Sequence, residues 1–171
     1  MVQLSKIEVT GDGQWFEYYV SPDDENDKIE LLIGSSASES YRKLQRKLGR
    51  VHAENNVNTS KRFGQKVKIS DADSWSSVIT LNVHLLKGWR GIEMTHGDYA
   101  KLMGTDLADG QDPNEVFVLV WSPDHARALL SNGGFGDMLE FVAGCGNDIA
   151  KHTKQHVETA VGNSQKSSSS S

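Results

Sequence analysis

The sequence has little cysteine and no long hydrophobic run. Its single cysteine, Cys145, excludes an internal disulfide framework and fits a reducing compartment. No segment approaches the roughly 18 consecutive apolar residues that a membrane-spanning helix requires. The N-terminal residues also lack the charged-then-apolar pattern of a secretory signal. We therefore expect a cytosolic protein that has no membrane partner.

Recognisable catalytic and metal-binding motifs are missing as well. His152 and His156 lie four residues apart, but no glutamate joins them in a metalloprotease-like motif. Cys145 falls on an apolar helical stripe, which is typical of a small core residue rather than a nucleophile. His84 and His125 have no serine or cysteine partner at a motif spacing. A group of acids resembles a metal cluster but matches no EF-hand register: Asp106, Asp109, Asp112 and Glu115. We predict a protein that is not an enzyme and binds no cofactor or metal.

The net charge of -5 hides a strong asymmetry along the chain. Residues 42–68 hold nine of the 18 lysines and arginines against one acid, Glu54, so this segment carries +8 and the rest of the chain -13. Such a split indicates either an acidic partner for the basic segment or neutralisation between the two halves of the chain.

The N-terminal third predicts strands followed by a basic helix. Residues 3–10, 14–20 and 28–34 are rich in β-branched and aromatic residues and are separated by turn signals, which predicts a strand meander. Ser36 or Ser38 can then cap a helix, whose apolar stripe consists of Tyr41, Leu44, Leu48 and Val51. The opposite face is cationic, and we expect a solvated surface there, with nucleic-acid binding as the alternative. The polar residues 55–70 predict a loop or mobile connector.

The centre of the chain, from Trp75 to Ile92, predicts a helix that ends at Lys87 and Gly88. Trp89 would then lie just beyond the helix end. We expect it to act as an architectural hinge, packed between this helix and the segment from Trp121 to Leu130.

The second half of the chain predicts short elements. A helical turn is expected at Tyr99–Met103, and the apolar run Glu115–Trp121 predicts a buried strand. Ser122 has the chemistry of a helix N-cap, and Pro123 suits the first helical position. A last helix should begin near Phe135 and carry an apolar face.

These patterns predict an α+β fold, in which a small N-terminal antiparallel strand meander precedes a helical bundle of about four helices with a short β insertion. We expect one compact domain over residues 1–160. It divides into a strand region (1–35), the basic and central helices (36–92), an acidic insert with a strand (93–121) and the C-terminal helices (122–156). The Ser-rich residues 161–171 are expected to form a disordered tail.

The order of these features resembles the tail assembly chaperones of long-tailed bacteriophages. The similarity lies in a strand region running into a basic helix (residues 14–44), a helix that ends in Trp-x-Gly (85–91), the helix start Trp-Ser-Pro-x-x-Ala-x-x-Leu-Leu (121–130), and a final helix (141–148). It covers roughly residues 14–156. One departure is the segment Met94–Val120, which is longer than the brief acidic hairpin of the family.

The resemblance implies a non-enzymatic chaperone of the infected host's cytoplasm that is absent from the mature virion. Such proteins bind the tape-measure protein, keep it soluble and help recruit tail tube subunits, and they often exist in two lengths made by ribosomal frameshifting. One alternative is a structural virion protein, such as a tail tube, neck or minor tail subunit. A weaker alternative is nucleic-acid binding through residues 42–68. The oligomeric state stays open, with a homo-oligomer among the possibilities.

Two sets of candidate residues follow. The candidate partner-binding residues are Arg42, Arg46, Arg50, Trp89 and Arg90. The residues of the structural motifs are Gly88, Trp89, Gly91, Trp121, Ser122 and Pro123.

Overall fold

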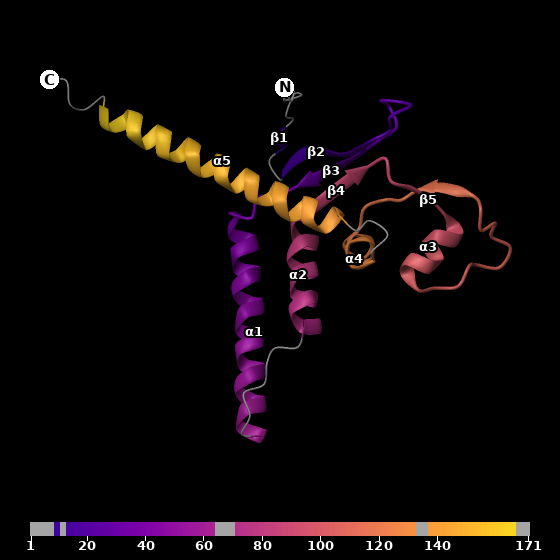
Figure 1. Cartoon of the computed structure of the whole chain (residues 1–171), viewed down its shortest axis with the longest axis horizontal. Coiled ribbons are helices and arrows are strands. Elements are labelled where there is room, and N and C mark those ends of the chain that lie inside the picture. The colour runs from indigo at the N-terminus through magenta and orange to yellow at the C-terminus, as the bar shows by residue number, and fades with distance from the viewer. Residues whose placement is uncertain (1–8, 11–12, 64–70, 133–136, 167–171) are drawn as a thin grey trace.

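A computed structural model describes residues 9–10, 13–63, 71–132 and 137–166 of the chain. Side-chain environments are described for residues 13–52, 73–132 and 137–155. Five helices and six strands occupy these ranges, and Figure 1 shows their arrangement. The α+β class predicted from the sequence is confirmed. Within the described residues, no helix is both long and apolar enough to cross a membrane.

A four-stranded antiparallel sheet forms the centre of the molecule. Its strands lie in the order β1 (Val9–Thr10), β2 (Gly13–Val20), β3 (Lys28–Ile33) and β4 (Leu86–Arg90). The first three strands follow one another in the sequence, which confirms the predicted meander for the described residues; residues 3–8 of its first predicted strand lie outside them. The fourth strand joins only after two helices have intervened, so the sheet ties the central part of the chain to its beginning.

The predicted end of the central helix was wrong. Helix α2 (Asp71–Leu85) stops before Leu86, and Gly88 lies within β4 opposite Leu32 of β3 rather than at a helix C-cap. The physical reason is long-range pairing: β4 gains a ladder of backbone hydrogen bonds from β3, with Trp89 placed opposite Leu31. The left-handed glycine follows the strand instead, at Gly91, where φ is 79°.

The helices pack together beside the sheet. Helices α1 (Glu39–Phe63) and α2 lie side by side, and α5 (Met138–Lys166) passes across their ends near the sheet (Figure 1). The predicted loop at residues 55–70 was wrong over 55–63, which belong to α1, while 64–70 lie outside the described residues. Helix α5 likewise continues through residues 161–166 of the expected disordered tail, and residues 167–171 lie outside the described part. The single-domain organisation stays a prediction.

The acidic insert forms a small lobe beside this assembly (Figure 1). Strand β5 (Glu93–Thr95) pairs with β6 (Val116–Val118), and helix α3 (His96–Met103) contains the predicted helical turn. The sequence predicts a buried strand in Glu115–Trp121. The strand is present as β6, but the predicted burial was wrong. Alternate residues Val116, Val118 and Val120 are 58%, 60% and 74% exposed, because no described element covers this face of the two-stranded sheet.

One hydrophobic core joins the sheet to α2, to α5 and to helix α4 (Pro123–Ser131). Its largest fully buried side chains come from both halves of the chain: Leu31, Ile33, Leu86, Ile92, Leu119, Leu129, Met138 and Val142. The basic and acidic halves therefore depend on each other for burial of their apolar residues.

Gly91 is required where β4 turns toward β5. Its φ of 79° is unfavourable for other residues, and a Cβ there would lie 2.0 Å from the backbone oxygen of Lys28. We expect Gly91→Ala to lower the free energy of unfolding by more than the roughly 1–3 kcal/mol that a strained backbone costs. The matched control is Gly104→Ala, where φ is 65° but no atom lies within 4 Å of the added Cβ. Chemical denaturation of both variants should rank Gly91→Ala as the worse, and equal losses would contradict the steric argument.

Candidate partner-binding surface

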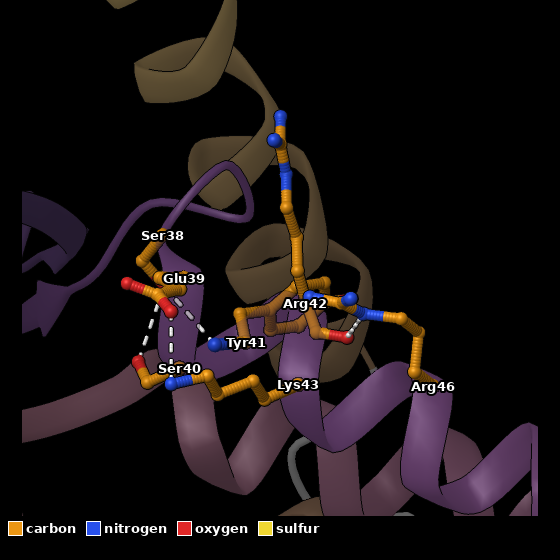
Figure 2. Close-up of polar contacts among 7 residues, drawn as sticks. All are labelled: Ser38, Glu39, Ser40, Tyr41, Arg42, Lys43 and Arg46. Carbon is orange, nitrogen blue, oxygen red and sulfur yellow. Dashed lines mark hydrogen bonds and ion pairs between the residues drawn. The ribbon is translucent and has the colours of Figure 1, made fainter.

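The N-terminus of α1 is fixed by local side-chain contacts (Figure 2). The hydroxyl of Ser38 accepts a hydrogen bond from the backbone N–H of Tyr41 at 3.3 Å, which confirms one of the two predicted caps. Glu39 and Lys43 form an ion pair of 2.8 Å one helical turn apart. These contacts start the helix at a defined residue and so determine which side chains share each of its faces.

Contacts with α2 set the orientation of α1. The Nε2 atom of His84 lies 3.1 Å from the hydroxyl of Ser40, and its ring lies 6.4 Å from that of Tyr41. Farther along the helix, Nε2 of His52 lies 2.5 Å from the hydroxyl of Ser77. The positions that touch α2 are therefore those on one stripe of α1, and the opposite stripe faces solvent.

That opposite stripe carries a cationic surface. Its five exposed members, which we call the α1 stripe, are Arg42, Lys43, Arg46, Lys47 and Arg50. They extend over about 12 Å of helix at 1.5 Å per residue. Lys43, Arg46, Lys47 and Arg50 also line a shallow hollow of about 340 Å³, together with Val51.

The α1 stripe has few acidic partners within the described part of the chain. Among the described residues only Lys43 of the five forms an ion pair, with Glu39. Arg46 turns back so that its Nε donates to the carbonyl oxygen of Arg42 at 3.2 Å, whereas the side chain of Arg42 extends away from Arg46 (Figure 2). Repulsion between neighbouring cations is thus left uncompensated within the described part of the chain, which favours an anionic partner.

Trp89 is not part of this surface. It is 7% exposed, and its indole Nε1–H donates to the carbonyl oxygen of Leu119 at 2.6 Å. The side chain therefore links β4 to Leu119, the residue that follows β6, and its place in the core gives it a structural role. As a partner-binding residue it was misplaced, because a side chain in the core offers no surface to a partner.

The other predicted site residues divide between the sheet and α4. Arg90 is exposed on β4, where its guanidinium lies 4.0 Å above the ring of Trp15, so it does not belong to the α1 stripe. Ser122 caps α4 by accepting a hydrogen bond from the N–H of His125 at 3.1 Å, and Pro123 occupies the first turn, as predicted. Trp121, just before this cap, packs against the core.

The titratable groups considered for catalysis have structural contacts. His125 donates from Nδ1 to the carbonyl oxygen of Val120 at 2.7 Å, and its Nε2 lies 3.0 Å from the hydroxyl of Tyr99. Burial, with a smaller contribution from Asp148, raises the pKa of the Cys145 thiol to about 11, so little reactive thiolate forms near neutral pH. His152 is exposed, and the side chain of His156 lies outside the described residues. Within the described part, no three histidines, cysteines or acids cluster as metal ligands do.

The α1–α2 contact should weaken in acid through His84. Burial, and to a lesser degree Lys87, lowers the pKa of this imidazole below 6.5 in the folded state. The unfolded chain therefore binds more protons at mildly acidic pH, and stability falls as the pH drops from 6.5 through the lowered folded pKa. We expect wild-type protein to lose more unfolding free energy than His84→Gln between pH 7 and pH 5. Identical pH dependence in urea denaturation would contradict this assignment.

The sequence did not indicate a second surface on the acidic lobe. In and just after β6, the exposed valines alternate with the partly buried Phe117 and the buried Leu119, and the valines at every second position were the available signal. Because the residues between the valines are apolar as well, the run predicts a strand that is buried on both faces.

Comparison of the chain with protein-family models finds no match, and comparisons with curated proteins and with solved structures also find none.

Proposed function

We propose that this protein is a non-enzymatic tail assembly chaperone that acts in the host cytoplasm. It binds the tape-measure protein of a long-tailed phage, keeps it soluble and helps recruit tail tube subunits. The observation that carries the proposal is the α1 stripe, a row of exposed cations on a long helix with few acidic partners among the described residues. The motif resemblance over residues 14–156 supplies the identity of the client.

The geometry of the α1 stripe suits a helical client. Its cations recur at three- and four-residue spacing from Arg42 to Arg50. A second helix packed along α1 can present carboxylates at the same spacing, so that several ion pairs form in register. Arginine also binds carboxylates through two parallel hydrogen bonds, which adds geometric selectivity. Val51 at the side of the hollow adds an apolar contact for such a helix.

The position of α1 supports the same role. The helix runs away from the sheet, and among the described elements α2 lies beside it (Figure 1). Its outer face is therefore open to a long partner that passes along the molecule. A holdase needs such an open face, because a helical client with exposed apolar residues aggregates unless a soluble partner covers part of it.

Co-expression provides the test. The chain should be produced with the very long coiled-coil protein encoded beside it, and the client should be found in the soluble fraction and in a pull-down with the chain. The control is the client expressed with the Arg46→Glu/Arg50→Glu variant of this chain. Failure of the two proteins to co-purify under conditions where the client is soluble would refute the proposal.

Purified virions separate the chaperone from a structural virion protein. A chaperone should be absent from particles analysed by mass spectrometry, whereas a tail tube, neck or minor tail subunit should be present in fixed copy number.

The α1 stripe could instead bind nucleic acid, and this alternative has its own test. It predicts affinity for DNA or RNA that falls steeply with salt, in proportion to the number of phosphates neutralised.

A further inference from the structure

Within the described part of the chain, β6 pairs with β5 alone, so its other edge is open and the backbone groups on that edge can be identified from the register. The N–H of Leu119 donates to the carbonyl of Ile92, and the N–H of His96 donates to the carbonyl of Glu115. In an antiparallel pair such bonded positions alternate with unbonded ones. Val116 and Val118, which lie opposite Thr95 and Glu93, are therefore unbonded positions, and their N–H and C=O groups point away from β5.

The side chains at this edge are also uncovered. Val116, Val118 and Val120 lie on one face and are 58%, 60% and 74% exposed. Natural edge strands are usually protected by lysine, proline or a bulge within the strand. Here the nearest prolines are Pro113 and Pro123, on either side of the apolar run, so the edge itself keeps its backbone groups and its apolar row available.

The charge around this edge determines the kind of partner. Residues 93–124 contain seven acids and one lysine, Lys101. Glu93 lies directly opposite Val118 on the exposed face, and the Glu115 side chain is 67% exposed just before Val116. A second copy of the chain, paired edge to edge here, would bring two such acidic lobes together and be repelled. A basic segment would be attracted.

We propose that β6 accepts an extended cationic segment of a partner protein as a third strand. In this segment apolar side chains alternate with lysine or arginine, so that one set lies over the valines while the other points to the opposite face, where Glu115 is exposed. Main-chain hydrogen bonds to Val116 and Val118 supply affinity, and the side-chain pattern supplies selectivity. This surface lies on the acidic lobe, away from α1 (Figure 1), so the proposal does not depend on the chaperone function.

Hydrogen exchange with synthetic peptides tests the proposal on the full chain. The probe is a seven-residue peptide of alternating lysine and valine with blocked ends, and the control peptide has glutamate in place of lysine. We expect the lysine peptide at saturation to slow exchange of the Val116 and Val118 amides by roughly tenfold or more, because they become hydrogen-bonded. The glutamate peptide should leave both amides unchanged.

A proline variant makes the test specific to the edge. Val118→Pro removes an N–H that points to the open side, so the β5–β6 hydrogen bonds are kept while the incoming strand loses a donor. Val118→Thr is the matched control, because it keeps both the N–H and the β-branched shape. Val118→Pro should abolish binding of the lysine peptide, Val118→Thr should retain it, and Glu115→Gln should weaken it.

Three results would overturn the proposal. The first is absence of protection at Val116 and Val118 with the lysine peptide. The second is equal binding of that peptide to wild-type protein and to Val118→Pro. The third is a wild-type dimer, measured by sedimentation, that Val118→Pro dissociates, because a second copy would then be the occupant of the edge. Each of these is independent of whether the α1 stripe binds its own client.

Discussion

Replacing Trp89 by alanine is expected to lower the free energy of unfolding by about 4 kcal/mol. The indole is 7% exposed within the core cluster, so its removal leaves a cavity as well as losing apolar contact. The carbonyl of Leu119 also loses the hydrogen bond from Nε1 and stays in the core without that donor. Denaturation in urea, with the slope compared between variants, measures the loss.

Two variants separate the components of this loss. Trp89→Phe keeps most of the aromatic packing but removes the donor to Leu119, so it should cost clearly less than the alanine variant. Trp75→Ala removes an indole that is 51% exposed and should change stability far less than Trp89→Ala. A loss below roughly 1 kcal/mol for Trp89→Ala would mean that the indole does not hold β4 to the acidic lobe.

Local signals in the sequence were sufficient for the elements that depend on local chemistry. The meander of β2 and β3 follows from apolar and β-branched runs separated by turns, and the start of α4 follows from the capping oxygen of Ser122 and the fixed φ of Pro123. Each of these interactions joins residues that are close together in the sequence, so the sequence alone is enough to predict it.

The end of the central helix could not be found in the same way. Leu85 and Leu86 continue the apolar spacing of α2, and Lys87-Gly88 has the chemistry of a helix end. The chain nevertheless changes to a strand at Leu86, because pairing with β3 buries Leu86 and Trp89 together. That contact joins residues more than fifty positions apart, and periodicity within a short window does not contain it.

The candidate site was predicted in part. Helical periodicity placed the cations of the α1 stripe on one face, and contacts of Ser40 and His52 with α2 are consistent with that face pointing to solvent. Trp89 and Arg90 were grouped with them because they are adjacent in sequence to a glycine-flanked turn. Alternation along β4 instead sends Trp89 into the core and Arg90 over Trp15.

Reversing two charges in the α1 stripe should weaken binding to the tape-measure client by roughly 100-fold or more. The double variant Arg46→Glu/Arg50→Glu replaces two attractive contacts by two repulsive ones, and both positions are exposed and distant in sequence from the helix cap. Helix α1 itself should tolerate the change, because glutamate has a good helix propensity and the new acids can pair with Arg42 and Lys47. Isothermal titration calorimetry with the purified client measures the affinity, and circular dichroism checks that the fold is kept.

The control for this variant is Lys101→Glu, which reverses an exposed cation on the acidic lobe. If the stripe is the binding surface, the control should keep wild-type affinity, and raising the salt concentration should weaken the wild-type complex much more than the complex of the double variant. If binding responded to net charge alone, the control would lose about half as much binding free energy as the double variant, because it reverses one charge instead of two. Unchanged affinity in the double variant would place the client elsewhere on the molecule, because a surface that had lost two of its five cations could not retain the same electrostatic contribution.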